Sequence, residues 1–188
     1  VVVDSVLVPF AAPVIGSTQI TDVSCNGLND GVIQVSPGSA TTVQYQWSNG
    51  ATGPVISSLS PGTYTLYASD SRPCYDTLQF VINQPSPITA NFQLTNETCF
   101  NSMDGSILVI PSGGVGGYTY LLNGLSVNNP IDSLGSGTYT VNIVDSNNCV
   151  YQASAGAISS PSSLTIALTA TPESGVNALD GTASAAVT

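Results

Sequence analysis

Short runs in which apolar and polar residues alternate recur along the chain, and turn residues bound each of them. Residues 30–38, DGVIQVSPG, begin at Asp-Gly and end at Pro-Gly, and residues 104–114, DGSILVIPSGG, have a similar arrangement. Residues 42–47 and 118–122 carry aromatic side chains at alternate positions. This pattern is typical of β-strands, and no segment has the 3.6-residue apolar period of a helix. We therefore predict an all-β fold.

Two longer segments each predict a hairpin. Residues 62–82 and 137–158 alternate on both sides of a polar turn, SDSRP in the first and DSNN in the second. With these hairpins, about seven short strands fall within about 75 residues, with turn residues every 8 to 12 positions or so. This is the pattern of an antiparallel β-sandwich of immunoglobulin-like type.

The same landmarks return at a nearly constant distance along the chain. Cys25 and Cys99 are 74 positions apart, Cys74 and Cys149 are 75 apart, and the sequence GTYT at 62 returns 75 positions later at 137. Agreement among these landmarks indicates a tandem repeat of about 75 residues.

The repeat divides the chain into four parts. We expect the tail of a preceding repeat at 1–15, complete modules at 16–87 and 88–163, and the start of a following repeat at 164–188. The last part contains a further Asp-Gly but lacks the cysteine. The segments NQPSPI and SSPSSL would form short, stiff linkers, so we expect the modules to be arranged end to end.

Composition narrows the range of partners. The 188 residues contain one cation, Arg72, no histidine and 11 carboxylates, which gives a formal net charge of -10. Nucleic acids and anionic membranes attract Lys/Arg surfaces, so we expect neither as a partner. The chain also has no apolar run of about 18 residues, so we expect no membrane insertion.

The four cysteines predict disulfides. Each module holds two, 49 positions apart in the first and 50 in the second. A zinc site usually needs C-x2-C pairs or histidine, and neither is present. We expect Cys25 to pair with Cys74 and Cys99 with Cys149, which implies an oxidising compartment. The alternative is four buried free thiols.

Equivalent positions predict the core of each module. We expect the following residues to be largely buried: Trp47, Tyr64 and Leu66 in the first module, and Tyr120, Tyr139 and Val141 in the second. Trp47, Tyr45 and Tyr64 could instead form a platform for stacking sugar rings. Their placement at alternate strand positions favours core packing.

The sequence predicts no catalytic site. The carboxylates are scattered among the turns and histidine is absent, whereas general acid-base chemistry usually needs a histidine or a carboxylate pair in a cleft. We therefore expect no enzyme activity and no cofactor.

Calcium is the one metal that the turns suggest. Asn101 with Asp104, and Asn177 with Asp180, supply oxygen ligands in short loops. Each loop offers only a few of the six to eight or so oxygens that Ca²⁺ takes. Asp-Gly is also a frequent tight-turn sequence in which glycine accepts positive φ, and we favour that interpretation.

At residues 23–35, VSCNGLNDGVIQV, at 45–88, and in their second copies, the chain resembles the SprB-type repeats of very large cell-surface adhesins in gliding bacteria of the Bacteroidota. The second module departs in having Tyr120 where the first has Trp47. The resemblance implies structural spacer repeats in a secreted filament used for attachment or gliding motility and exported by type IX secretion. The alternative that it leaves open is a carbohydrate-binding or enzyme-associated module of a secreted protein.

The resemblance also implies a location and partners. It places the chain outside the cell, at the cell surface, with neighbouring repeats of the same chain as partners. Surface polysaccharide and the gliding or secretion machinery are further candidates. Secreted proteins of these bacteria are often O-glycosylated at Asp-Ser/Thr followed by a small or aliphatic residue, a motif that Ser5, Thr77 and Ser133 match.

Overall fold

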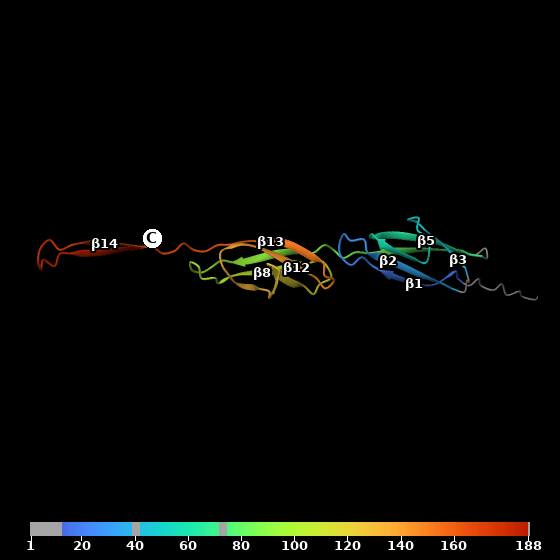
Figure 1. The fold of residues 1–188 in the computed structure, drawn as a ribbon, viewed down its shortest axis with the longest axis horizontal. Coiled ribbons are helices and arrows are strands. Elements are labelled where there is room, and N and C mark those ends of the chain that lie inside the picture. Colours follow the sequence, from blue (N-terminus) through green and yellow to red (C-terminus); the bar gives the residue numbers. More distant parts are fainter. Residues whose placement is uncertain (1–12, 39–41, 72–74, 188) are drawn as a thin grey trace, which may run out of the picture. The chain divides into compact units, whose positions relative to one another are not determined.

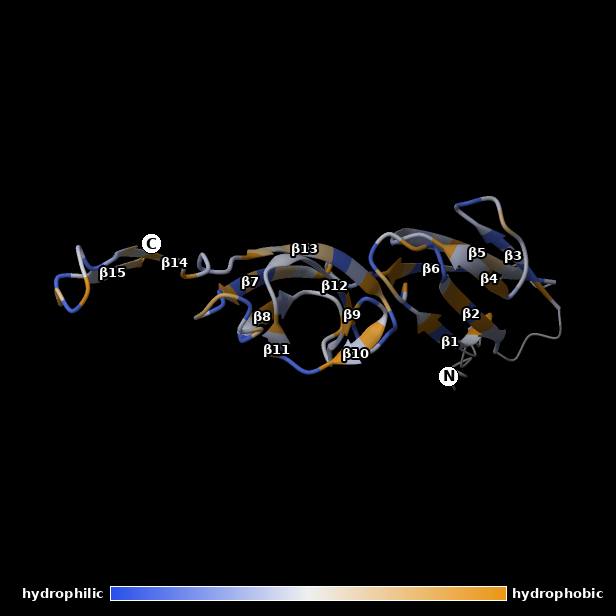
Figure 2. Cartoon of the chain, turned by 60° about the vertical axis from the view of Figure 1, so that its left-hand side comes forward, coloured by the Kyte–Doolittle hydropathy of each residue, from blue (hydrophilic) through white to orange (hydrophobic). Residues whose placement is uncertain are grey.

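The computed structural model describes residues 13–38, 42–71 and 75–187, and their regular structure is β throughout (Figure 1). The predicted all-β fold is therefore confirmed. Apolar residues lie along the strands of both sandwiches, whereas several of the connecting loops are hydrophilic (Figure 2). In the part of the chain that the structure describes, no helix has the length and apolar character to cross a membrane.

The first sandwich consists of two three-stranded antiparallel sheets, with the orders β1-β2-β4 and β3-β5-β6. Its strands are β1 (Ile15–Thr21), β2 (Gly31–Pro37), β3 (Val43–Trp47), β4 (Val55–Leu59), β5 (Gly62–Asp70) and β6 (Tyr75–Ile82). Alternate residues of these strands, together with Val14 before β1 and Val23 after it, form one core, which also comprises Ile15, Ile33, Val35, Trp47, Ile56, Leu59, Leu66, Ala68, Phe80 and Ile82. The alternation in the sequence therefore marks the inward faces of both sheets.

The second sandwich has sheet orders β11-β8-β7 and β10-β9-β12-β13. Its strands are β7 (Thr89–Thr95), β8 (Gly105–Ser112), β9 (Thr119–Leu122), β10 (Leu125–Val127), β11 (Ile131–Leu134), β12 (Gly137–Val144) and β13 (Val150–Ile158). Buried residues in these strands are Ile107, Val109, Ile131, Leu134, Val141, Ile143, Ala155 and Ile158. The order matches that of the first sandwich, with β10 as an additional short strand.

The strand order is that of an immunoglobulin-like sandwich. Successive strands change sheets between β2 and β3, β3 and β4, and β4 and β5, which gives Greek-key connections. Each sandwich also has a tyrosine corner, a tyrosine near the start of a late strand whose hydroxyl donates to the backbone a few residues upstream. Tyr64 Oη donates to Ser60 O at 3.0 Å, and Tyr139 Oη donates to Gly135 O at 2.8 Å.

Part of the predicted core is wrong, because the tyrosines in it are not fully buried. Trp47, Leu66 and Val141 are buried as expected. Tyr64, Tyr120 and Tyr139 are only half-buried. For Tyr64 and Tyr139 the reason is that the hydroxyl reaches a backbone carbonyl, so each ring lies partly outside the core.

Glycine follows aspartate at the start of β2 and β8 because the two sheets approach closely there. A Cβ on Gly31 would lie 2.8 Å from Ile82 Cγ2, and one on Gly105 would lie 2.8 Å from Ile158 Cγ2. Neither glycine has positive φ. The tight-turn interpretation of these Asp-Gly pairs is therefore wrong, since the glycine serves packing between sheets.

The remaining strands, β14 (Ile166–Thr171) and β15 (Thr182–Val187), form an antiparallel hairpin. Their side chains are exposed.

The chain divides into two compact units. The first contains the residues up to 89 together with 111–119 and 144–151, and the second contains 90–110, 120–143 and 152–188. The loops 111–119 and 144–151 of the second sandwich thus group with the first sandwich and with the linker that follows it. The end-to-end arrangement of modules and the four-part division stay predictions.

Candidate functional site

One loop structure occurs at three places, at residues 24–30, 98–104 and 174–180, which we call the Asp-anchored loops. In each, the first residue donates its backbone N–H and its side-chain hydroxyl to the aspartate at the end. The pairs are Ser24–Asp30, Thr98–Asp104 and Ser174–Asp180, with N–H···O distances of 3.0, 3.0 and 2.8 Å. The aspartate before each glycine therefore closes a loop of its own.

A tight turn inside each Asp-anchored loop is also shared. The backbone N–H of Leu28, Ser102 and Ala178 donates to the carbonyl three residues earlier, at 3.1, 3.2 and 3.2 Å. The residue just before each of these donors has positive φ, and the three residues are Gly27, Asn101 and Asn177. Glycine and asparagine adopt this backbone most readily. Asn101 and Asn177 therefore have a conformational role.

Hydrogen bonding lowers the pKa of all three aspartates because it stabilises the charged carboxylate. The Ser24 hydroxyl, then the Ser24 N–H, lowers the pKa of Asp30. The hydroxyls of Ser102 and Thr98, with the Thr98 N–H, lower that of Asp104 to about 2. The Ser174 hydroxyl and N–H lower that of Asp180.

The Asp-anchored loops do not assemble a calcium shell. The carboxylates of Asp104 and Asp180 accept hydrogen bonds from their own loops. Within residues 13–38, 42–71 and 75–187, no three His, Cys, Asp or Glu side chains gather where they could hold a metal ion. The residues present thus do not fit the six to eight or so oxygens of a Ca²⁺ site.

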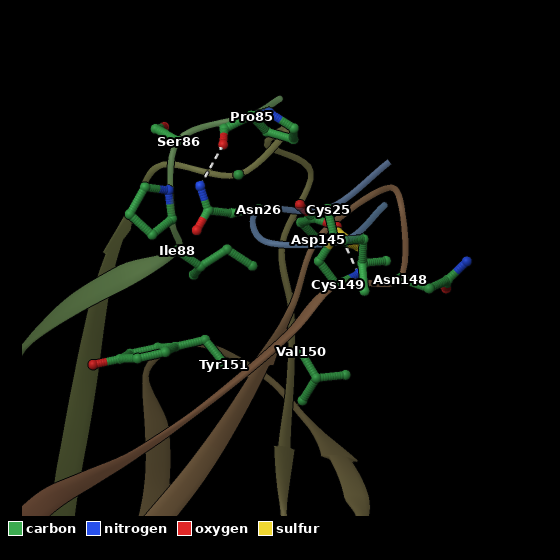
Figure 3. A pocket seen from close by; sticks show the side chains of 13 residues that line it. Cys25, Asn26, Pro85, Ser86, Ile88, Asp145, Asn148, Cys149, Val150 and Tyr151 are labelled. Carbon is green, nitrogen blue, oxygen red and sulfur yellow. Dashed lines mark hydrogen bonds between the residues drawn. A yellow bond between two sulfur atoms is a disulfide. The ribbon is translucent and has the colours of Figure 1, made fainter. Parts of the chain in front are cut away.

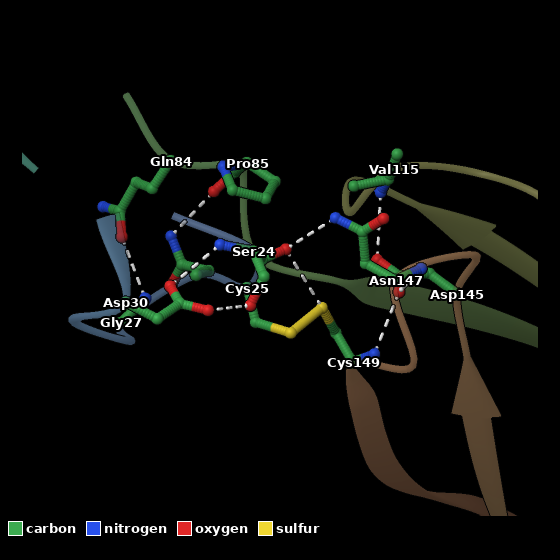
Figure 4. Close-up of a disulfide and its surroundings, with 11 residues drawn as sticks. Ser24, Cys25, Gly27, Asp30, Gln84, Pro85, Val115, Asp145, Asn147 and Cys149 are labelled. Atoms are coloured by element: carbon green, nitrogen blue, oxygen red, sulfur yellow. Dashed lines mark hydrogen bonds between the residues drawn. A yellow bond between two sulfur atoms is a disulfide. The ribbon is translucent and has the colours of Figure 1, made fainter. Parts of the chain in front are cut away.

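The first Asp-anchored loop is covalently linked to a turn of the second sandwich. Cys25 forms a disulfide with Cys149, with Cα atoms 5.6 Å apart and a sequence separation of 124 (Figure 4). Cys99 is free and exposed. Cys74 lies outside the described residues. The predicted pairing of Cys25 with Cys74 and Cys99 with Cys149 is therefore wrong.

The length of the strands explains why the predicted pairs do not form. The Val23 N–H donates to Asn83 O, so Cys25 lies near the end of β6, whereas Tyr75, the residue that follows Cys74 in the sequence, is at its start. Equally, Glu97 N donates to Ser159 O, past the end of β13, whereas Cys149 precedes its start. Strands of 8 and 9 residues span roughly 25 to 30 Å, far beyond the Cα separation of about 7 Å that a disulfide tolerates.

Polar contacts accompany the disulfide. Asn147 Nδ2 donates to the backbone carbonyl of Ser24 at 2.9 Å (Figure 4). The Cys149 sulfur, which carries no proton in the disulfide, lies 3.4 Å from the same oxygen. The loop and the turn thus meet through one disulfide and one hydrogen bond to Ser24.

Asp145 shapes the turn that carries Cys149. Its side chain is 4% exposed and accepts hydrogen bonds from the backbone N–H of Val115, Asn147 and Cys149 at 3.0, 2.9 and 2.9 Å. Burial pushes the pKa of Asp145 upward, but the three N–H donors together outweigh it, so the pKa is lowered. A charged carboxylate therefore holds the turn in position.

The linker between the sandwiches contacts both sides of this joint. Asn26 Nδ2 donates to Pro85 O at 3.0 Å, and the Gly27 N–H donates to Gln84 Oε1 at 2.8 Å. On the other side, the Gly114 N–H donates to Ser86 O at 2.9 Å. We call the disulfide, the linker residues 84–88 and these contacts the Cys25–Cys149 joint.

A cavity of about 400 Å³ opens at the Cys25–Cys149 joint (Figure 3). It is lined by the linker, including Pro85, Pro87 and Ile88, and by residues that include Val150 and Tyr151 at the start of β13. Its lining is mostly apolar, and Asp145, its one carboxylate, is bound by backbone N–H groups. The cavity therefore offers packing surface without a nucleophile and base in contact.

Trp47 packs in the core, as predicted, and not in the alternative sugar platform. Trp47 is 2% exposed, packs on Phe80 with ring centroids 5.5 Å apart, and donates Nε1–H to Gly53 O at 3.0 Å. Tyr45 and Tyr64 are half-buried.

Other tyrosines, which the sequence reasoning missed, lie outward on sheet β3-β5-β6. Tyr67 and Tyr75 are 55% and 80% exposed. Tyr67 on β5 lies opposite Gln46 on β3. Two residues further along β5, Ser69 lies opposite Tyr75 on β6. The signal was present in the alternation, because Tyr67 lies between the inward residues Leu66 and Ala68. A hollow of about 510 Å³ lies along these residues.

The O-glycosylation motifs lie on different parts of the chain. Thr77 on β6 and Ser133 on β11 are exposed, and Ser5 lies outside the described residues. Their modification stays a prediction.

A solved structure and a family model are similar to parts of this chain. Among solved structures, the chain is similar to the crystal structure of murine CEACAM1b, with 19% identity, a TM-score of 0.31, and coverage of 78% of this chain and 86% of that one. No curated protein gave a significant match. The SprB repeat family model matches residues 17–52 and 91–127. The predicted resemblance is thus confirmed, and the two matching segments lie one in each sandwich.

Proposed function

We propose that this segment is a structural spacer, without enzyme activity, in a very large secreted adhesin or filament at the cell surface. The observation that carries the proposal is the Cys25–Cys149 disulfide, which ties one SprB-type repeat to the next. A spacer must transmit pulling forces from repeat to repeat, and a covalent tie beside the linker suits that task.

Further features support a spacer. Asn26 and Gly27 hold the linker by hydrogen bonds to Pro85 and Gln84, so the linker is more than a flexible tether. A disulfide is stable in an oxidising environment, which supports an extracellular location. Neighbouring repeats are the proposed partners. Roles in attachment or gliding motility, and export by type IX secretion, belong to this proposal through the SprB-type resemblance.

A replacement experiment tests the spacer role. In the full-length protein, residues 16–163 are exchanged for two tandem β-sandwich domains of an unrelated secreted protein, and a second strain carries a deletion of the same residues. We expect the exchange to preserve surface attachment and the deletion to reduce it, with surface display matched by antibody labelling. If the exchanged protein is displayed normally but attaches as poorly as the deletion, the repeats contribute specific binding and the spacer proposal fails.

A second candidate is binding of neutral glycans by the outward face of sheet β3-β5-β6. The exposed tyrosines Tyr67 and Tyr75 favour it, since aromatic faces beside amides such as Gln46 suit uncharged sugars. This candidate predicts glycan-array binding that Tyr75→Ala weakens, with Val150→Ala as an exposed control on another strand. An array without binding would exclude it.

A further inference from the structure

Cys99 occupies the same place in the second Asp-anchored loop as Cys25 occupies in the first. Both cysteines follow the residue that donates to the anchoring aspartate. Both also supply the carbonyl that accepts the turn hydrogen bond, from Leu28 at 3.1 Å and from Ser102 at 3.2 Å. The two loops therefore present their cysteines on the same backbone scaffold.

The segment that follows each sandwich is held in the same way. Asn83 N–H donates to the Asp22 side chain at 2.8 Å, and Ser159 N–H donates to the Asn96 side chain at 2.9 Å. Next, the linker side chain of Gln84 accepts from the N–H of Gly27 at 2.8 Å, and Ser160 Oγ accepts from the N–H of Asn101 at 3.2 Å. The chain leaving the second sandwich is thus directed past Cys99 as the first linker is directed past Cys25.

The first Asp-anchored loop already has a segment of the second sandwich bound to it. The Cys149 turn binds it through the disulfide and through Asn147, which donates to Ser24 O. The second loop offers the corresponding exposed thiol, Cys99, after Thr98, the equivalent of Ser24. The Cys25–Cys149 joint therefore serves as an observed template for the ligand that Cys99 would take.

We propose that the Cys99 loop is a docking site for the hairpin turn of a further repeat, a turn of the Asp-x-x-x-Cys kind formed by residues 145–149, and that the two cysteines form a disulfide. The inference goes beyond the proposed spacer function and does not depend on it. The proposed pairing has a direction, because the loop of one repeat binds the turn of the next repeat. Such a head-to-tail contact extends into an open series.

The covalent step is an oxidation of two thiols. Cys99 and the turn cysteine lose two protons and two electrons to a small-molecule disulfide such as oxidised glutathione, which is reduced to two thiols. Exchange proceeds through a mixed disulfide with the more reactive thiolate. In the third Asp-anchored loop, Gly175 stands at the cysteine position while the turn hydrogen bond from Ala178 is kept at 3.2 Å. The third loop keeps the same backbone structure but has no thiol. It therefore cannot form the next disulfide, and the series of disulfide-linked repeats ends there.

The test uses full-length variants of this chain that each keep a single cysteine. The loop chain keeps Cys99 (Cys25→Ser, Cys74→Ser, Cys149→Ser), the turn chain keeps Cys149 (Cys25→Ser, Cys74→Ser, Cys99→Ser), and a reference chain keeps Cys25 (Cys74→Ser, Cys99→Ser, Cys149→Ser). Loop and turn chains are mixed in a glutathione redox buffer, and disulfide dimers are quantified by mass spectrometry. We expect the Cys99–Cys149 heterodimer to exceed both homodimers about tenfold and to match the reference Cys25–Cys149 heterodimer within about threefold.

Two controls separate docking from random thiol collision. Asn147→Ala in the turn chain removes the hydrogen bond to the loop carbonyl and should lower the heterodimer yield about threefold to tenfold. Val55→Ala, at an exposed position of β4, should leave the yield unchanged. Circular dichroism confirms that every variant remains folded.

The outcomes are decisive in either direction. A heterodimer no more abundant than the homodimers, or one insensitive to Asn147→Ala, would overturn the proposal. Failure of the reference pair as well would also overturn it, since loop and turn would then not recognise each other between chains. For the unmodified protein, the single variant Cys25→Ser offers a second measurement. We expect Cys99–Cys149 links in multimers, and the same link confined to monomers would contradict the head-to-tail rule.

Discussion

The side-chain amide of Asn147 donates to the backbone carbonyl of Ser24 at 2.9 Å, across 123 positions of sequence. Asn147 lies in the turn that Asp145 organises, and Ser24 opens the Asp-anchored loop that Asp30 closes. Two loops, each held by its own aspartate, therefore meet at this hydrogen bond, and the disulfide beside it joins them.

The disulfide pairing predicts which cysteines matter for stability. Cys25→Ser and Cys149→Ser should each lower the free energy of unfolding by about 2 to 5 kcal/mol, and the double variant should lower it no further, because all three remove one bond. Cys99→Ser should change it by less than about 0.5 kcal/mol, since that thiol is free and exposed. Denaturant unfolding measures these differences. An effect of Cys99→Ser as large as that of Cys25→Ser would contradict the observed pairing.

The anchoring aspartates predict an acid-sensitive loop. The folded pKa of Asp104 is about 2, below its ordinary value of 3.8. The stabilisation is therefore complete above about pH 4 and is lost as the pH falls through about 2. Unfolding measured against pH should show a shallower decline across this window in Asp104→Asn than in the unmodified chain. Asp132→Asn, at an exposed position of β11, serves as the control, and identical pH profiles for both variants would speak against the anchoring role.

The glycine at the start of β8 should not tolerate a side chain. A Cβ on Gly105 would lie 2.7 Å from Leu134 O and 2.8 Å from Ile158 Cγ2. Gly105→Ala should therefore destabilise the second sandwich by about 1 to 3 kcal/mol through overpacking. Gly175→Ala meets no neighbouring atom within 4 Å and should stay within about 0.5 kcal/mol. Thermal or denaturant unfolding checks both, and equal stability of the two variants would refute the close-packing explanation.

The tyrosine corners predict a small and specific loss. Tyr139→Phe removes only the hydroxyl that donates to Gly135 O, so the free energy of unfolding should fall by about 0.5 to 1.5 kcal/mol. Tyr64→Phe should have a similar effect through Ser60 O. Tyr67→Phe, on an exposed ring, is the matched control and should be nearly neutral. A neutral Tyr139→Phe would show that its hydrogen bond contributes nothing to the fold.

One repeat position exchanges an apolar residue for an acid. Val23 is 3% exposed in the first sandwich, and its equivalent Glu97 is 5% exposed in the second. Glu97 Oε1 accepts from the Met103 N–H at 2.8 Å, but Oε2 has no hydrogen-bond partner. Glu97→Val should therefore stabilise the second sandwich by about 1 to 3 kcal/mol, because it removes an unsatisfied buried group. The same unfolding assay measures this gain, and a loss would mean that the bond to Met103 outweighs the burial cost.

Periodicity and repetition in the sequence were enough to predict the all-β fold and the immunoglobulin-like sandwich. Alternation placed Trp47 and Leu66 inward correctly, since a strand in a sandwich has one buried face. The half-buried tyrosines escaped prediction because a hydroxyl bond to a nearby carbonyl is decided by loop geometry that alternation does not encode.

The disulfide pairing could not be inferred from spacing. Equal intervals of about 50 residues show that the cysteines recur in register, but not at which end of the sandwich each one lies. The observed bond depends on Cys25 and Cys149 lying at one joint, as the contacts of Asn26 with Pro85 and of Asn147 with Ser24 show. Likewise, each Asp-Gly pair at the start of β2 and β8 combines an aspartate that anchors a loop with a glycine that allows close packing between the sheets. The dipeptide alone does not distinguish these two roles from an ordinary turn.

The bond between Cys25 and Cys149 also closes the intervening chain into a covalent ring. When the two chain ends are pulled apart, the load path runs through β1, crosses the sulfur bridge and continues into β13, so the peptide bonds of residues 26–148 lie off that path. Most buried residues of both hydrophobic cores belong to the ring. Unfolding under load in the oxidised chain therefore withholds roughly 400 Å of contour length, at about 3.3 to 3.6 Å per residue, which only reduction of the bridge releases.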